Sequence, residues 1–443
     1  MIDVRLAATH VLTSLMQHQG SLNTALPDVS AQVSNKDTAL LKQLVYGTSR
    51  EYFRLHALTE HLLQKPFHSK DTDLHVCLLL GLYQLREMRI PEHAVIHETV
   101  ELTKVLNKPW AKGLINAVLR RYQREAISLD QLLSQDNDIY HWNHPEWMIR
   151  KLQHNWPDHW QQILIQNDIR APMTLRVNKR LLSTDKYIQK LTDFGIEADH
   201  SSVAPHAVIL THPVDVMELP GFFEGECSVQ DEAAQLSVEL LDIEPNMHIL
   251  DACAAPGGKL CHLIEHTADQ TIMVDAIELN PGRIPRIHDN LERLGFSQLC
   301  RVITGDASEQ DWWDGRLYDR ILIDAPCSGS GVIRRNPDIK FLRQNEDLLK
   351  LASIQLAILT NLWSMLKPNG TLVYATCSIF PQENERVIER FCKSRKDVQH
   401  HPLELPSAYQ RPFGTQFFPK FNSHDGFFYA KLTKLDATGM SDL

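Results

Sequence analysis

Two cysteines lie in motifs whose residue types could support covalent chemistry on a pyrimidine ring. Cys327 lies in DAPCSG (324–329) and Cys377 in TCS (376–378). C5 of a cytosine is a poor nucleophile, but addition of a thiolate at C6 activates C5 to take a methyl group from a sulfonium. A second residue can then help to remove the C5 proton and expel the thiolate. A lone cysteine at a strand end is usually a small buried residue. Two at one edge favour a nucleophilic site, although their spacing does not show which thiol attacks.

A glycine-containing loop and four acidic residues could hold a nucleoside cofactor with a small charged end. The loop is CAAPGGK, residues 253–259, whose adjacent glycines allow close backbone approach and whose following helix offers free amides to an anion. It is neither G-x-G-x-x-G nor G-x-x-x-x-G-K-[ST], so neither a dinucleotide fingerprint nor a phosphate loop is indicated. One acid at a strand end is usually a helix cap, but four at one edge predict a nucleoside pocket, with Glu278 suited to ribose. These acids are Asp251, Glu278, Asp306 and Asp324.

These residues need a parallel sheet to bring them to one edge. From about Gln230 onward, apolar runs typical of strands alternate with helical stretches such as 281–294, 346–366 and 383–391. A parallel sheet with helices on both faces binds its ligands at the carboxyl ends of its strands. The predicted strands are 248–251, 272–278, 301–306, 320–324, 371–376 and 427–432.

The residues before this sheet predict two further regions. Leucines at helical spacing, interrupted by Pro66, Pro91 and Pro109, favour an all-helical domain over residues 1–135. Residues 136–228 predict a tryptophan-containing helical connector and a small α+β subdomain, with strands at 174–178 and 207–210 and a helix over 183–194 that ends at Gly195. The sheet occupies residues 229–443. A chain of 443 residues suits about three domains.

Composition limits the partners and the compartment. The net charge of −10 argues against non-specific nucleic-acid binding by the whole surface. One stretch without acids is equally consistent with a phosphate-contacting stripe and with a solvated helix face. Its basic residues are Lys104, Lys108, Lys112, Arg120, Arg121 and Arg124. The eight cysteines include no C-x-x-C pair, so no metal site is indicated. We find neither a signal peptide nor an apolar run of membrane-spanning length, which favours a cytoplasmic protein with reduced thiols.

Four motifs, in this order and spacing, resemble the S-adenosylmethionine-dependent RNA cytosine-C5 methyltransferases: CAAPGGK (253–259), DAPCSGSG (324–331), RRNPD (334–338) and YATCS (374–378). The segments LVYGTSREYFRLH (44–56) and GLINAVLRR (113–121) are similar to the domain related to the antitermination factor NusB. Together they resemble the bacterial B-type methyltransferases of small-subunit (16S) ribosomal RNA over essentially the whole chain. The implied fold is a Rossmann-like methyltransferase domain, preceded by an all-helical NusB-like domain and a small α+β subdomain.

The resemblance assigns roles to the motif residues. It implies that Cys377 attacks C6 and that Cys327 assists breakdown of the covalent adduct. Glu278 would bind ribose and Asp306 would lie by the adenine, while Asp324 would lie between the cofactor and the target base, which Lys259 would also reach. Arg334 and Arg335 would contact RNA phosphates, although a solvated surface pair is nearly as well supported. The methionine part of S-adenosylmethionine would be held by Cys253, Ala254, Ala255, Pro256, Gly257, Gly258 and Lys259.

The resemblance also implies the reaction: methylation of C5 of one cytidine in 16S ribosomal RNA, nucleotide 967, by a monomer. The target base must be unstacked, since a thiol cannot attack C6 within a helix. One departure is that Glu278 stands where many relatives carry aspartate, and Asn280 stands where a second acid is frequent. The longer Glu278 retains two acceptor oxygens, so we expect cofactor binding to survive.

Three other functions fit these sequence features less well. A catalytically idle RNA-binding assembly factor of the ribosome would not need both cysteines and an intact glycine loop. A DNA cytosine methyltransferase would use the cysteine after the fourth strand as its nucleophile, and neither the second thiol nor the helical domain suits it. An amino-group methyltransferase would carry an N-P-P-Y-type motif where this chain has DAPCS.

Overall fold

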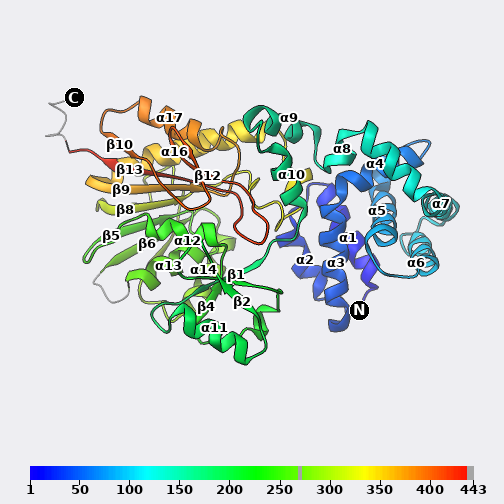
Figure 1. Ribbon diagram of the computed structural model, residues 1–443, viewed down its shortest axis with the longest axis horizontal. Coiled ribbons are helices and arrows are strands. Elements are labelled where there is room, and N and C mark those ends of the chain that lie inside the picture. Colours follow the sequence, from blue (N-terminus) through cyan, green and yellow to red (C-terminus); the bar gives the residue numbers. More distant parts are fainter. Residues whose placement is uncertain (268–271, 437–443) are drawn as a thin grey trace. The chain divides into compact units, whose positions relative to one another are not determined.

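The computed structural model describes residues 1–267 and 272–436, which form two compact units (Figure 1). The first unit contains residues 1–169 together with 333–345. The second contains residues 170–332 and 346–443. The segment 333–345 therefore follows the Cys327 motif in sequence but packs as part of the helical unit.

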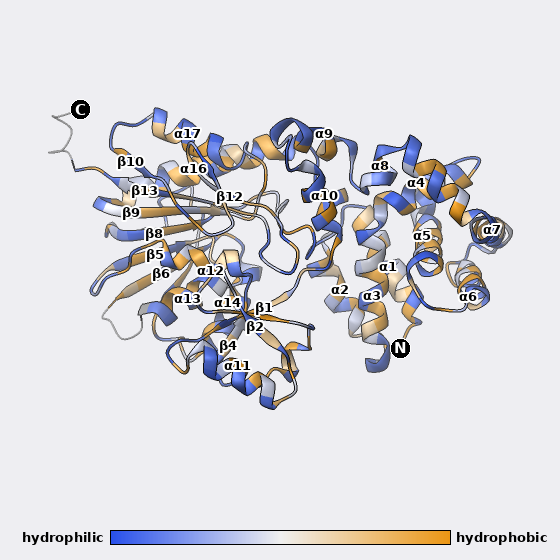
Figure 2. Ribbon diagram, viewed as in Figure 1, coloured by the Kyte–Doolittle hydropathy of each residue, from blue (hydrophilic) through white to orange (hydrophobic). Residues whose placement is uncertain are grey.

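The first unit is all helical, which confirms the prediction from leucine spacing. Asp3 begins the first helix by accepting hydrogen bonds from the amides of Arg5 and Leu6. The fifth helix is buried on most of its surface, as its leucine-rich sequence requires, and Figure 2 shows its hydrophobic character. The helices are α1 (Val4–Met16), α2 (Leu22–Ser30), α3 (Thr38–Arg50), α4 (Tyr52–Leu62), α5 (Thr72–Glu87), α6 (Glu92–Val105), α7 (Lys112–Asp136), α8 (Asp138–Trp142), α9 (Glu146–Asn155), α10 (Trp160–Asp168) and α15 (Ile339–Leu342).

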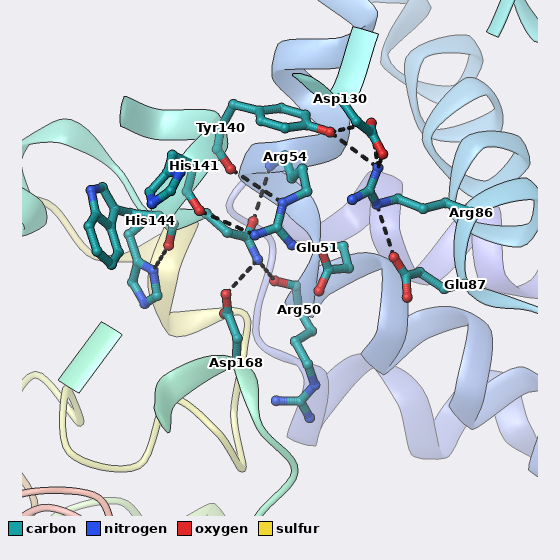
Figure 3. Close-up of polar contacts among 12 residues, drawn as sticks. Arg50, Glu51, Arg54, Arg86, Glu87, Asp130, Tyr140, His141, His144 and Asp168 are labelled. Carbon is teal, nitrogen blue, oxygen red and sulfur yellow. Dashed lines mark hydrogen bonds and ion pairs between the residues drawn. The ribbon is translucent and has the colours of Figure 1, made fainter. Parts of the chain in front are cut away.

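A buried polar cluster joins the helices of this unit (Figure 3). The Asn143 side-chain amide donates to the Arg50 carbonyl oxygen at 2.8 Å and to Asp168 at 3.0 Å. Lys340, whose side chain is fully buried, donates to Asp168 at 2.8 Å and to the Asn143 carbonyl oxygen at 2.9 Å. Nearby, Arg86 forms an ion pair with Asp130 at 2.7 Å. Residues 333–345 are thus held in the helical unit by charge-assisted bonds.

The second unit begins with a small antiparallel sheet of order β2-β3-β1-β4 and the helix α11 (Thr184–Asp193). The predicted strands at 174–178 and 207–210 and the predicted helix are confirmed. Two further strands were not predicted, because each has only three residues and shows no alternation of apolar and polar residues. The strands are β1 (Met173–Val177), β2 (Ala198–His200), β3 (Ala207–Leu210) and β4 (Cys227–Val229).

A nine-stranded sheet follows, with the order β11-β12-β13-β9-β8-β5-β6-β7 and β10 paired with β13. Its strands β5 to β9 are parallel, which confirms the predicted Rossmann-like fold class. The predicted strand at 427–432 exists but is antiparallel to its neighbour, and three short strands before it were not predicted. The strands are β5 (His248–Ala252), β6 (Met273–Glu278), β7 (Arg301–Thr304), β8 (Tyr318–Asp324), β9 (Leu366–Thr376), β10 (Val398–His401), β11 (Tyr409–Arg411), β12 (Gly414–Phe417) and β13 (Phe427–Lys434).

Helices cover both faces of this sheet (Figure 1). Two separate apolar cores lie on its two sides, one including Leu260 and Ile287, the other including Leu359 and Phe391. Helix α16 is long and apolar enough to cross a membrane by length and composition alone, whereas we expected no apolar run of that length. Its residues Leu359 and Leu362 are buried in the core. The helices are α12 (Glu232–Glu239), α13 (Gly258–Thr267), α14 (Ile284–Arg293), α16 (Asp347–Met365) and α17 (Glu385–Lys393).

Candidate active site

The two predicted cysteines meet at the carboxyl edge of the parallel strands. Cys327 follows β8 and Cys377 follows β9, and these strands are neighbours in the sheet. Their sulfur atoms lie 3.3 Å apart, within hydrogen-bonding distance. The hydrogen bond with Cys377, together with burial, raises the pKa of the Cys327 thiol well above its ordinary value. Cys327 is therefore a protonated thiol at neutral pH, and it lies directly beside the second sulfur.

An ion pair lies beside the cysteines. The Lys259 ammonium donates to Asp324 at 2.7 Å and lies 5.2 Å from the centre of the Phe427 ring. Burial alone would lower the pKa of Lys259, but Asp324 and the nearby Cys377 raise it. Lys259 is therefore a cation close to the Cys377 sulfur. The structure brings together the lysine of the glycine loop, the acid at the end of β8 and both thiols, as the sequence predicts for one strand edge.

The glycine loop makes a tight turn between β5 and α13. Its Ala255–Pro256 peptide bond is cis, and Gly257 has a φ of +99°, a conformation that favours glycine over residues with a Cβ atom. The Gly257 amide donates to the Ala254 carbonyl oxygen at 2.7 Å, and α13 begins at the next residue, Gly258. The first amides of a helix have no partner within that helix, so this turn presents donors suited to an anion.

Two of the predicted acids, Glu278 and Asp306, lie at or just beyond the ends of neighbouring strands but have different surroundings. Glu278, at the end of β6, is buried and accepts from the Ala255 amide at 3.2 Å and the Asn280 amide at 3.0 Å. Asp306 was expected to close a strand, but β7 ends at Thr304 and Asp306 lies in the turn beyond it. There its Oδ1 accepts from the amide and the hydroxyl of Ser308. Glu278 is thus held rigidly against the loop, while Asp306 shapes the adjoining turn.

Asp251 differs from the other strand-end acids because it is fully buried within β5. Within residues 1–267 and 272–436, neither of its carboxyl oxygens has a hydrogen-bond partner. Burial, and then the nearby Asp324 carboxylate, raises the pKa of Asp251 to about 8. An unpaired buried carboxyl group is costly, so such a group indicates a missing partner.

The two arginines of RRNPD have different environments. Arg334 is 1% exposed, and its carbonyl oxygen accepts from Arg50 at 2.9 Å within the helical unit. Arg335 is partly exposed. A buried guanidinium is poorly placed to meet RNA phosphates, so only Arg335 keeps a geometry that suits the sequence-based role.

The basic stretch of residues 104–124 does not form a continuous helical stripe. Lys104 lies in the last turn of α6, Lys108 in the connection and Lys112 at the start of α7. Lys108 pairs with both Asp71 and Asp73, at 2.9 Å and 2.6 Å. Lys104 and Lys112 share one acid, Glu101, at 2.5 Å and 3.2 Å. The stretch contains no acids, but Asp71, Asp73 and Glu101 pair with its three lysines, so these lysines do not form the phosphate-contacting stripe that the sequence left open.

Sequence reasoning missed the buried carboxylate Glu383. It accepts hydrogen bonds from Ser328 and Ser378, the residues that directly follow the two cysteines. The only available signal was the polar run QENE at 382–385 after an apolar pair. Among the residues that the structure describes, no cluster of three or more His, Cys, Asp or Glu side chains is arranged to hold a metal ion.

Comparisons with known proteins agree along the chain. The family described as 16S rRNA methyltransferase RsmB/F matches residues 238–433. A ferredoxin-like domain of RsmF/B-like methyltransferases matches residues 144–217, and the NusB family matches residues 3–124. A crystal structure of the protein PH0851 has a TM-score of 0.80 at 21% identity, covering 98% of this chain and 99% of that one, which shows a shared fold. A methyltransferase homologue from Pyrococcus horikoshii has a TM-score of 0.59 at 25% identity, covering 67% and 97%.

Full-length relatives have the same name. The ribosomal RNA small subunit methyltransferase B of Pseudomonas syringae pv. tomato is 45% identical over 443 residues, covering 98% of each chain. The protein of that name from Vibrio vulnificus is 43% identical over 434 residues, covering 98% of this chain and all of the relative. At these identities, and with all three domain families in the same order, the chain belongs to the ribosomal RNA small subunit methyltransferase B family.

Proposed function

We propose that this protein transfers a methyl group from S-adenosylmethionine to C5 of one cytidine in 16S ribosomal RNA, through a covalent bond between Cys377 and C6. By family resemblance, the cytidine is nucleotide 967 and the protein acts in the cytoplasm as a monomer. The observation that carries the proposal is the contact of two thiols, 3.3 Å apart, beside the Lys259–Asp324 pair. A site for simple RNA binding has no need of two thiols in contact.

The residues of the glycine loop and the acidic edge fit S-adenosylmethionine. The amides at the start of α13 would bind its carboxylate, and Glu278 would bind its ribose hydroxyls. Asp306 would lie by the adenine. Asp251 supplies the orphaned buried acceptor that a cationic ligand end would satisfy. When bound, the cofactor supplies an electrophilic methyl group on a positively charged sulfur.

Lys259 and Asp324 would recognise the target base. An ionised carboxylate accepts hydrogen bonds, which suits the exocyclic amino group of cytosine. The Lys259 ammonium donates, which suits the carbonyl oxygen of the same base. Lys259 also lies near Cys377, so the two groups that would contact the base belong to one site.

The two thiols would act in sequence. The Cys377 thiolate bonds to C6, and the electron pair of the C5=C6 double bond makes C5 nucleophilic toward the methyl group. A base must then take the C5 proton, so that the C–H electrons restore the double bond and Cys377 leaves as a thiolate. Cys327, whose sulfur atom lies 3.3 Å from that of Cys377, is placed to assist this step, as the family resemblance implies.

Single-stranded RNA would be held partly by exposed arginines. We place phosphate contacts on Arg120, Arg124 and Arg335, which are at least partly exposed. Replacing Arg120 and Arg124 with glutamine should weaken RNA binding and leave cofactor affinity unchanged. An unchanged RNA affinity would remove these residues from the interface.

Cysteine variants test the reaction itself. We would incubate each protein with labelled S-adenosylmethionine and unmodified 16S ribosomal RNA, map 5-methylcytosine, and look for protein–RNA bands that resist denaturation. Cys377→Ser should abolish transfer and keep cofactor affinity. Cys327→Ala should accumulate the covalent band, because the adduct cannot break down. Cys392→Ser, a change on α17, is the control and should behave as wild type.

Two outcomes would contradict the proposal. No 5-methylcytosine from the wild-type protein would exclude the reaction. A trapped band from Cys377→Ala and none from Cys327→Ala would mean that the roles of the two thiols are reversed.

A further inference from the structure

A single buried carboxylate contacts both cysteine-bearing loops. Glu383 is fully buried, and its Oε2 accepts from the Ser328 and Ser378 hydroxyls, each at 2.6 Å. Its Oε1 accepts from the Ser328 amide at 2.7 Å. Ser328 directly follows Cys327, and Ser378 directly follows Cys377. The Glu383 carboxylate therefore contacts the residue that directly follows each cysteine.

Further hydrogen bonds make this contact a closed network. The Ser330 hydroxyl lies 3.0 Å from that of Ser328 and 3.1 Å from that of Ser378, and it accepts from the Ile379 amide at 3.0 Å. From α16, the Gln355 side-chain amide donates to the Pro326 carbonyl oxygen at 2.9 Å and to Glu383 at 3.3 Å. Burial raises the pKa of Glu383, and the hydrogen bonds that it accepts oppose this shift because they favour its ionised form. The network thus fixes both loops relative to each other and to α16.

The backbones of the two loops also meet. The Gly331 amide donates to the Cys377 carbonyl oxygen at 2.9 Å, and the Gly426 amide donates to the Gly331 carbonyl oxygen at 2.8 Å. Strand pairing alone ends before the cysteines, since β8 ends at Asp324 and β9 at Thr376. Beyond these points, the side-chain network acts together with the Gly331 backbone bonds to hold the two cysteine-bearing loops beside each other.

The charge of Glu383 also reaches the thiols. Its carboxylate is one of the groups that raise the pKa of Cys327, after the contact with Cys377 and burial. Glu383 therefore affects a measurable property of Cys327 as well as its position.

We propose that Glu383 is a positioning residue that holds Cys327 and Cys377 at contact distance, a role that rests on the covalent reaction proposed above. Glu383 does not touch the base, so its effect on the reaction passes through the two thiols. A displacement of about 1 Å at a reacting group can cost about 100-fold in rate. Glu383→Gln should therefore lower kcat by about 100-fold and leave the KM for S-adenosylmethionine unchanged.

The distance between the thiols is testable without RNA or cofactor. Diamide takes two electrons and two protons from a pair of adjacent thiols, which become a disulfide. In wild-type protein it should join Cys327 to Cys377, as shown by peptide mass spectrometry. Glu383→Gln should form this disulfide about tenfold more slowly, because loops that separate lower the effective concentration of one thiol at the other. Glu385→Gln is the matched control, because Glu385 lies two residues after Glu383, pairs with Arg411 on β11 and should leave the disulfide rate unchanged.

A second variant and a pH profile separate positioning from misfolding. Ser378→Ala removes one hydroxyl contact without removing the charge, so it should slow disulfide formation with little change in the Cys327 alkylation profile. Glu383→Gln should move that profile, measured with iodoacetamide in a Cys377→Ser background, to lower pH. Far-ultraviolet circular dichroism checks that each variant is folded.

Equal rates of disulfide formation and equal alkylation profiles in wild type and Glu383→Gln would overturn the positioning role. This result is distinct from failure of the proposed reaction, in which the wild-type protein would form the disulfide but give no 5-methylcytosine.

Discussion

The buried ion pair between Arg176 and Glu265 provides a quantitative test of how the small subdomain supports the glycine loop. Arg176 lies on β1, and Glu265 lies on α13. Arg176 donates from Nε at 2.9 Å and from its terminal nitrogen at 2.7 Å to the two oxygens of Glu265. The two side chains are 0% and 3% exposed. Arg176 also donates to the Gly258 carbonyl oxygen at 2.8 Å, where the loop enters its helix.

The expected cost of breaking this pair follows from its burial. Removing one partner of a buried ion pair leaves the other charge without compensation, which costs about 3–5 kcal/mol. The Gly258 carbonyl oxygen also loses a donor, which adds about 1 kcal/mol. Arg176→Met should therefore lower the free energy of unfolding by about 4–6 kcal/mol, a large share of the stability of an ordinary domain, which is about 5–15 kcal/mol.

Urea unfolding of four proteins measures this cost: wild type, Arg176→Met, Glu265→Leu and the double variant. The double variant contains no buried charge at this position, so it should lose less stability than either single variant. An exposed pair provides the control: Arg316→Met breaks the contact of Arg316 with Asp314, whose side chains are 53% and 31% exposed, and should leave the urea midpoint close to that of wild type.

Two results would refute this reasoning. If the free energy of unfolding of Arg176→Met lies within about 1 kcal/mol of the wild-type value, the ion pair is not as buried as its side-chain exposures indicate. If the double variant loses the sum of the two single losses, then the two side chains do not interact energetically.

Three further predictions concern other contacts. Lys340→Met leaves the partly buried Asp168 carboxylate without its ammonium partner, and urea unfolding should show a loss of about 1–3 kcal/mol from the helical unit. A Cβ atom at Gly331 would lie 2.1 Å from the Gly426 carbonyl oxygen, so Gly331→Ala should separate the loops and lower kcat by about 100-fold in the methyl-transfer assay. Arg395 lowers the pKa of Asp397 from 3.8 to about 2. Because the folded state holds the carboxylate ionised, its stabilisation is present above pH 3.8 and is lost as the pH falls toward about 2. After screening it amounts to about 1 kcal/mol, and acid unfolding of Asp397→Asn should lack it.

The parts of the fold that were predictable are those in which local pattern and burial agree. The strands β5, β8 and β9 are apolar runs bounded by turns, and α16 and α11 show helical spacing. The strands β10, β11 and β12 were missed because they have three or four residues each, and the first two are only partly buried. Their pairing depends on β13 and β12, which is non-local information.

The candidate site shows the same division. The motif residues themselves could be found because each is close in sequence to a strand end. Their supporting partners come from distant positions: Glu383 is 55 residues from Ser328, and Arg176 is 89 residues from Glu265. The neutralisation of Lys108 by Asp71 and Asp73 likewise crosses between elements. Sequence alone contains no spacing rule for such contacts, so the basic stripe was predicted where the fold has paired charges.

The buried charges around this site are better explained by geometry than by stability. Well-packed apolar side chains can replace a buried ion pair with little loss of stability, so the Arg176→Met/Glu265→Leu protein should fold almost as well as wild type. Leucine and methionine, however, impose no direction on the Gly258 carbonyl oxygen, which Arg176 fixes with a directed hydrogen bond. We therefore expect the double variant to bind S-adenosylmethionine at least about tenfold more weakly in titration calorimetry, although its urea midpoint is nearly retained. Wild-type affinity in this stable double variant would show that the ion pair does not position the loop.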